Sequence, residues 1–115
     1  MLPRDDLVRV RHMLDATNEA IGYAAGRSRH DLDTDTMLGR ALANCLAVVG
    51  EAAARVGAET RSLYSTIPWS LIVGMRNRLI HAYFDIDQDE VWMTITGDLP
   101  ELACRLQAML DEQEP

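Results

Sequence analysis

Residues 33–57 carry the pattern that most restricts how this chain can fold. Apolar side chains recur there at the three- and four-residue spacing of a helix, at Leu38, Ala41, Leu42, Cys45, Val49 and Ala52. Leu46 and Val48 widen this stripe, which indicates contact with neighbours on more than one side. Acids and hydroxyls in Asp33-Thr34-Asp35-Thr36 favour a helix start, and Gly57 is expected to end the helix. The sequence therefore predicts a central helix around which the other helices pack.

Four further helices are expected on either side of this one. The first runs from Pro3 to Gly26, with two acids in its first turn. After the central helix, the third of the five helices runs from about Pro68 to Ala82 or Tyr83 and is apolar on more than one face. A short helix containing Val91, Trp92 and Ile95 is expected to stop at Gly97. Asp98 is predicted to cap a last helix with the stripe Leu99, Leu102, Leu106 and Met109.

The connections complete the predicted architecture. Residues 27–33 are polar and are expected to form a connection with at most one short turn, and residues 58–66 are expected to form a loop. We predict an all-α fold, an antiparallel bundle of about five helices, because the connections are short. It would be a single domain over residues 1–115 with its core in about residues 5–110. The helix from Pro68 has more apolar surface than so few helices can cover, which favours a symmetric homodimer.

Charge and cysteine content restrict the class of protein. The formal net charge is −7 at pH 7, which disfavours nucleic-acid binding through a broad basic surface but leaves room for a local cationic site. No apolar run of transmembrane length and no signal-peptide pattern is evident. Cys45 and Cys104 both fall on apolar helical positions and are expected to be reduced core residues. We predict a cytoplasmic protein.

The stretch from Met75 to Phe84 concentrates the groups that can do chemistry. It reads Met-Arg-Asn-Arg-Leu-Ile-His-Ala-Tyr-Phe, and its apolar content predicts a buried segment. On a continuous helix, Asn77 and His81 would lie on one face, and Arg76 and Tyr83 would be nearly aligned. Arg76 and His81 would diverge by about 140° on that helix. A long arginine side chain or a second copy of the helix would then be needed to bring them together.

The extended string GMRNRLIHAYF, with Arg76, His81 and Tyr83 as its polar signature, resembles the HepT-type HEPN ribonuclease toxins. These are small helical proteins encoded beside a minimal nucleotidyltransferase antitoxin. The sequence Gly50-Glu51-Ala52-Ala53 also resembles the family's second long helix, where small residues would let another helix approach closely. Glu51 is expected to be exposed at a helix edge or paired with an arginine. The likeness covers about residues 5–110, with Ala47-Val48-Val49 as one departure.

The resemblance implies a metal-independent endoribonuclease acting on cellular RNA, with transfer RNA as one candidate. A histidine can act as acid or base near neutral pH, and an arginine can hold a phosphate through two hydrogen bonds. His81 would be the acid–base residue, Arg76 the phosphate clamp and Asn77 an orienting residue. One histidine per chain supplies half of an acid–base pair, so two chains would complete the site. The alternative is that Arg76 and His81 only bridge helices.

The resemblance gives Tyr83 a separate role, as the residue that the partner nucleotidyltransferase adenylylates. Added AMP would place bulk and negative charge beside Arg76 and His81 and would block an RNA phosphate. The partner would need ATP and Mg²⁺, whereas the toxin itself is expected to need no cofactor or metal. The alternatives are a tyrosine that only packs at a helix end, and a non-enzymatic HEPN subunit that binds a nucleotidyltransferase.

The remaining polar and aromatic features have plainer interpretations. Asp85, Asp87, Asp89 and Glu90 lack the glycine and the final acid of an EF-hand loop, because Glu90 and Thr96 occupy those positions. We interpret the run as a solvated turn or part of an antitoxin-docking surface. Trp69 and Trp92 are expected to anchor the core or an interface.

Overall fold

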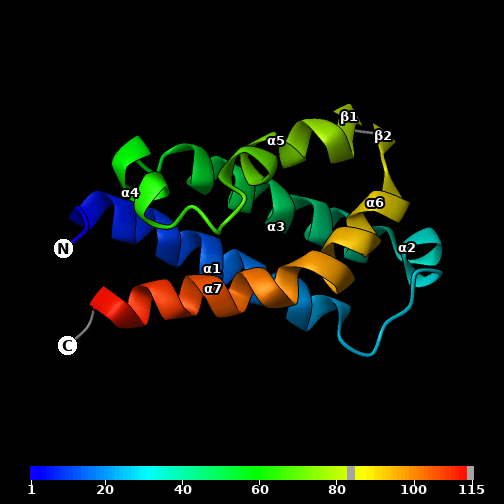
Figure 1. Cartoon of the computed structure of the whole chain (residues 1–115). Coiled ribbons are helices and arrows are strands. Elements are labelled where there is room, and N and C mark those ends of the chain that lie inside the picture. The colour runs from blue at the N-terminus through cyan, green and yellow to red at the C-terminus, as the bar shows by residue number, and fades with distance from the viewer. Residues whose placement is uncertain (83–84, 114–115) are drawn as a thin grey trace.

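The computed structural model describes residues 1–82 and 85–113 and shows an elongated helical bundle (Figure 1). Four long helices form its body: α1 (Arg4–Ala24), α3 (Thr36–Ala54), α5 (Trp69–Leu79) and α7 (Leu99–Gln113). Shorter elements are α2 (Asp31–Thr34), α4 (Ala58–Leu63), α6 (Gln88–Met93), a π-helical turn η1 (Thr94–Asp98), and strands β1 (Ile80–Ala82) and β2 (Asp85–Ile86). Helix α1 packs along both α3 and α7, and α3 packs against α5. The predicted all-α bundle is confirmed.

Helix α3 is the central helix, as its stripe predicts. Leu42, Leu46 and Val49 are at most 1% exposed, whereas Val48 faces outward. With 19 residues, α3 is long and apolar enough to cross a membrane by length and composition, contrary to the sequence-based expectation. However, 56% of its most apolar 18-residue stretch is buried within the molecule, and the helix packs against α1 and α5. It is the core helix of this bundle.

Small residues on α3 let α5 approach closely, as expected for the Gly50 segment. A Cβ atom added at Gly50 would lie 3.1 Å from the carbonyl oxygen of Ile72 and 3.7 Å from that of Val73. Ala52 and Ala53 are buried on the same helix, and Glu51 is exposed. Backbone therefore packs against backbone where the two helices meet.

Residues 58–66 were expected to form a loop, and that prediction is wrong because they contain α4. Distant side chains stabilise this short helix. The buried Asp6 carboxylate of α1 accepts hydrogen bonds from Gly57 N–H at 3.1 Å and from the Thr60 hydroxyl at 2.5 Å. The Arg61 guanidinium donates to the carbonyls of Ala53 and Val56, at the end of α3. Local sequence alone does not reveal these partners.

Gly97 and Asp98 do not separate two helices, which corrects a second expectation. The chain continues from α6 through η1 into α7 without a break. Burial of Ile95 and Leu99, at 2% and 1% exposure, offsets the roughly 1 kcal/mol that a helical glycine costs relative to alanine. Thr94 and Asp98 of the π-helical turn line a groove beside α5.

The third correction concerns the end of α5, which was expected to reach Ala82 or Tyr83. The helix stops at Leu79, and Ile80 takes an extended conformation with φ −121° and ψ 101°. Residues 80–82 pair antiparallel with β2, with Ile80 opposite Ile86. The Asp87 N–H also donates to the Leu79 carbonyl at 2.8 Å. Both isoleucines pack on the core, so cross-strand burial ends the helix.

Candidate active site

A two-stranded hairpin positions His81. In β1 the side chains of Ile80 and Ala82 are half-buried, whereas His81 between them is exposed. Alternate residues of a strand point to opposite faces, so anchoring Ile80 against the core directs His81 toward solvent. The position of the histidine is therefore set by the pairing of β1 with β2.

The last turn of α5 presents Arg76 and Asn77. Their neighbours Met75 and Leu79 are 3% and 1% exposed and hold the turn on the core, while Arg76 and Asn77 are exposed. Among the described residues, the side chains of Arg76, Asn77 and His81 form no hydrogen bond or ion pair. Within the part of the chain that the structure describes, they do not bridge helices, and their donors and acceptors are available to another molecule.

These positions change the geometry expected from a continuous helix. Asn77 and His81 do not lie one turn apart on one helix face, because His81 belongs to β1. The motif segment is also less buried than its apolar content predicts, since only its aliphatic members reach the core. Tyr83 lies outside the described residues. What remains is a group of three exposed polar side chains, Arg76, Asn77 and His81, within six residues at one end of the bundle.

This end of the molecule is the one opposite the chain termini. Figure 1 shows β1 and β2 beyond the end of α5, near α6 and α2, with both termini at the other end of the bundle. Acidic residues nearby have structural partners. Asp87 accepts from Glu90 N–H at 3.1 Å and caps α6, and Asp89 accepts from Arg29 Nε at 2.6 Å. Asp87 and Asp89 thus stabilise the start of α6, which follows the hairpin.

The tryptophans and cysteines are placed in part as expected. Trp69 is 6% exposed, and its indole N–H donates to the Tyr64 carbonyl at 3.0 Å, so it is a core anchor. Trp92 is half-buried against the core. Cys45 is buried, and burial raises the pKa of its thiol. Cys104 is exposed, which corrects its assignment to the core.

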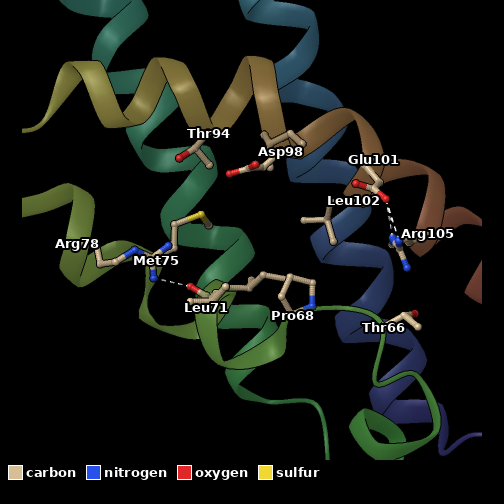
Figure 2. A pocket seen from close by; sticks show the side chains of 12 residues that line it. Thr66, Pro68, Leu71, Met75, Arg78, Thr94, Asp98, Glu101, Leu102 and Arg105 are labelled. Atoms are coloured by element: carbon tan, nitrogen blue, oxygen red, sulfur yellow. Dashed lines mark hydrogen bonds and ion pairs between the residues drawn. The ribbon is translucent and has the colours of Figure 1, made fainter.

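A groove lies beside the motif between α5 and the η1–α7 segment (Figure 2). Its volume is about 310 Å³. It is lined by Thr66, Pro68, Leu71, Ile72, Met75, Arg78, Thr94, Asp98, Leu99, Glu101, Leu102 and Arg105. Sequence reasoning did not identify this groove. The spacing of Leu71, Met75 and Arg78 on one helix face was the available signal, but the opposite wall depends on the π-helical turn.

An all-α bundle that exposes an arginine, an asparagine and a histidine at one end has the arrangement expected of the HEPN class of small helical domains. Comparison with known proteins makes the assignment specific. The family model described as Ribonuclease HepT-like matches residues 13–109, and the chain belongs to this family. This membership confirms the predicted resemblance and the enzyme class, an endoribonuclease.

Individual relatives agree with this assignment. The chain is 33% identical over 105 residues to "Putative RNase TTE0752" of Caldanaerobacter subterraneus subsp. tengcongensis, covering 91% of this chain and 94% of that protein. It is 33% identical over 69 residues to "Probable ribonuclease HepT" of Thermococcus cleftensis, covering 60% of this chain and 63% of that one. A search of solved structures finds no match.

Proposed function

We propose that this protein is the toxin of a toxin–antitoxin pair, an endoribonuclease that cleaves cellular RNA without a metal ion. The observation that carries the proposal is the exposed group Arg76, Asn77 and His81 at the end of α5 and in β1, which has no hydrogen-bond or charged partner in residues 1–82 and 85–113. A structural role would pair these side chains within the chain. A role on RNA requires them to be accessible.

The proposed chemistry assigns one task to each side chain. The Arg76 guanidinium holds the scissile phosphate, and its charge stabilises the additional negative charge of the transition state. His81 transfers a proton, either from the attacking 2′-hydroxyl or to the departing 5′-oxygen. Asn77 orients the histidine or a phosphate oxygen. These groups need no metal, and transfer RNA is one candidate substrate.

We also propose that the working enzyme is a homodimer. Cleavage through a 2′-hydroxyl uses one base and one acid, and each chain contributes a single histidine to the motif. A second copy would supply the other histidine and a second arginine. The composite site would lie across the two-fold axis.

Catalysis is tested with purified protein and a fluorescent RNA containing single-stranded segments, in buffer with EDTA. We expect His81→Ala and Arg76→Ala each to lower the cleavage rate about 100-fold or more. Both side chains are exposed, so the circular dichroism spectrum and melting temperature should not change. The matched control is Arg55→Ala, which removes an exposed arginine at the far end of α3. Equal cleavage by wild type and His81→Ala would refute the assignment.

Neutralisation is proposed to occur by adenylylation of Tyr83 by a partner minimal nucleotidyltransferase, which uses ATP and Mg²⁺. Support comes from the spacing of Tyr83 two residues after the exposed His81. The test is intact mass after co-expression with the neighbouring nucleotidyltransferase gene. We expect a gain in whole AMP units that is absent from Tyr83→Phe. An unmodified mass would contradict this mode of neutralisation.

A second candidate is a non-enzymatic subunit that binds a nucleotidyltransferase. The net charge of −7 favours it, because an acidic surface suits a basic protein partner better than RNA. The two candidates differ in cells expressing this chain alone. An enzyme should arrest growth, and Arg76→Ala should relieve the arrest, whereas a binding subunit should have no effect.

A further inference from the structure

We propose that the groove between α5 and the η1–α7 segment is a subsite for one guanine base of the RNA, with Asp98 binding the base and Arg78 holding a neighbouring phosphate. This inference rests on the proposed ribonuclease function. It adds a base preference to that function and names the two residues that set it.

The groove has the size and the apolar floor of a small-ligand site. Its volume of about 310 Å³ lies at the lower end of the range of ligand pockets, roughly 300–1,000 Å³. Met75, Leu99 and Leu102 line it and are at most 8% exposed, while Leu71 at its rim is 62% exposed. A methionine sulfur makes favourable contacts with aromatic rings. An apolar slot of this kind therefore suits a flat aromatic base.

The wall opposite α5 carries polar groups that have no partner in the described part of the chain. Thr94 is 9% exposed, and its hydroxyl forms no hydrogen bond among the described residues. The Asp98 carboxylate likewise has no hydrogen-bond or charged partner there. Figure 2 shows both side chains across the groove from Met75 and Arg78. Polar groups as enclosed as the Thr94 hydroxyl normally find a partner within a protein, so this wall is available to a ligand.

A π-helical turn brings these two residues to the groove. The Leu99 N–H donates to the Thr94 carbonyl, five residues back, instead of four as in an α-helix. Thr94 and Asp98 both line the groove, whereas Ile95 between them is 2% exposed in the core. Single π-helical turns are rare and occur frequently at functional sites. The turn is thus a second observation that points to a ligand at this wall.

The chemistry of Asp98 selects guanine among the four RNA bases. An ionised carboxylate only accepts hydrogen bonds, and its two oxygens can accept from two parallel donors. Proteins that recognise single-stranded RNA bind the Watson–Crick edges of its bases. On that edge only guanine presents two adjacent donors, N1–H and the N2 amino group. Each other base places an acceptor next to its donor, and that acceptor would face a carboxylate oxygen.

Arg78 supplies a cation on the opposite wall. Its Nη1 donates to the Leu71 carbonyl at 2.7 Å, which holds the guanidinium at the groove (Figure 2). A guanidinium has five N–H donors, so this contact leaves others for a phosphate. Arg105 and Glu101 also line the groove, but they pair with each other at 2.8 Å. Among the described residues Arg78 has no acidic partner.

The position of the groove relative to the motif fits a base close to the cleaved bond. Two residues of a helix are about 3 Å and 200° apart, so Arg76 and Arg78 lie on different sides of the last turns of α5. The helix ends at Leu79. A single strand held at Arg76 can therefore pass round this end into the groove. With a net charge of −7, such local contacts suit the chain better than a broad basic surface.

The experiment measures RNA binding by fluorescence anisotropy in buffer with EDTA, using His81→Ala protein so that the RNA stays intact. The probes are labelled short uridine oligoribonucleotides that carry one central guanosine, inosine or adenosine. We expect the guanosine strand to bind about tenfold more tightly than the adenosine strand. Inosine keeps N1–H but lacks the N2 amino group, so its strand should bind with intermediate affinity.

Variants assign the preference to the groove. Asp98→Asn replaces one acceptor oxygen by a donor and should abolish the preference for guanosine. Glu59→Gln is the matched control, because it removes the same charge from an exposed residue of α4 outside the groove and should keep the preference. Arg78→Ala should weaken binding of every strand and reduce the slope of log affinity against log salt concentration by about 0.7. Arg55→Ala should leave that slope unchanged.

The inference is overturned if the guanosine and adenosine strands bind equally, if Asp98→Asn keeps the preference, or if no strand binds. Guanosine 5′-monophosphate that binds as tightly as the guanosine strand would also overturn it, because the groove would then take a free nucleotide. A preference lost in Asp98→Asn, together with a wild type that cleaves no RNA, would support the subsite and refute the proposed function. RNA cleavage without any guanosine preference in binding would do the reverse.

Discussion

At the scale of single residues, Gly50 is the glycine whose added Cβ would meet backbone atoms of another helix. A Cβ there would press on the Ile72 carbonyl at 3.1 Å, and backbone cannot move aside as a flexible side chain can. We expect Gly50→Ala to lower the free energy of unfolding by about 1–3 kcal/mol, measured by urea denaturation. Gly97→Ala is the control, because its Cβ would meet nothing within 4 Å. It should be neutral or stabilising, since alanine favours helix.

Asp6 is the residue on which α4 depends. Asp6 is 8% exposed, and its carboxylate accepts hydrogen bonds from Gly57 N–H and from the hydroxyl of Thr60, a residue that is 1% exposed. Asp6→Ala leaves both donors without this acceptor, and we expect a loss of about 2–3 kcal/mol in urea denaturation. The exposed neighbour Asp5 tests the specificity of the effect. Asp5→Ala should change stability by no more than about 0.5 kcal/mol, and equal losses would contradict this role of Asp6.

Sequence reasoning at this scale succeeded where a helical stripe decides burial. It placed Leu42, Leu46 and Val49 in the core because one helix face meets several neighbours. It failed for Cys104, which is exposed although it borders the α7 stripe. Burial at the edge of a stripe depends on how far the neighbouring helix extends, which spacing does not contain.

At the scale of elements, the start of α3 is sensitive to acid. Asp35 accepts from Arg27 Nη2 at 2.9 Å and from Leu38 N–H at 3.1 Å. The Arg27 hydrogen bond, followed by the Leu38 N–H, lowers the pKa of Asp35 below its ordinary value of 3.8. A lowered pKa in the folded state stabilises the protein above the unfolded-state pKa, and this contribution disappears as pH falls through the folded-state pKa.

We therefore expect wild type to be more stable than Asp35→Asn at neutral pH, with the difference shrinking below about pH 4. The measurement is urea denaturation at a series of pH values. Asparagine keeps a cap acceptor, so the comparison isolates the charge. Glu51→Gln serves as the control, because Glu51 is exposed and makes no ion pair among the described residues. A pH-independent difference for Asp35→Asn would contradict the assignment.

The elements that sequence reasoning missed share one cause. Helix α4 depends on Asp6, the hairpin depends on Ile80 meeting Ile86, and the continuity of η1 with α7 depends on buried neighbours. In each case the deciding contact comes from outside the element. Local propensity favoured a loop at residues 58–66, a helix extending beyond Leu79, and a helix end at Gly97. Tertiary contacts outweighed these local preferences.

At the scale of the whole molecule, the two termini lie together at the end opposite the motif (Figure 1). Leu2 N–H donates to Gln113 Oε1 at 3.1 Å, and the Tyr64 hydroxyl donates to the Glu112 carboxylate at 2.5 Å. We expect a circular permutant, with residues 1 and 115 joined by about six glycine and serine residues and new ends between Ala25 and Gly26, to keep its helical spectrum and unfold cooperatively. A permutant opened within α3 should not fold.

The contacts between the two termini lie at the end of the bundle opposite the residues proposed to cleave RNA. This permutant joins the termini at the end distant from Arg76 and His81 and opens the chain between α1 and α2, outside the motif hairpin. It should keep RNA cleavage within about threefold of wild type, because the motif hairpin is held by local pairing and by the core. A permutant that folds but loses cleavage would show that the proposed site depends on the intact connection between α1 and α2 or on the free termini.

The sequence by itself determined the helical class, the central position of α3, the close approach at Gly50 and the family through its motif, because these depend on spacing along the chain. Tertiary structure alone decided that α5 ends at Leu79, that His81 points outward from a strand, and that Arg78 and Asp98 face one groove. The physical reason is that a residue's helical spacing is local, whereas its strand partner, its burial and its unpaired charge depend on residues distant in the sequence.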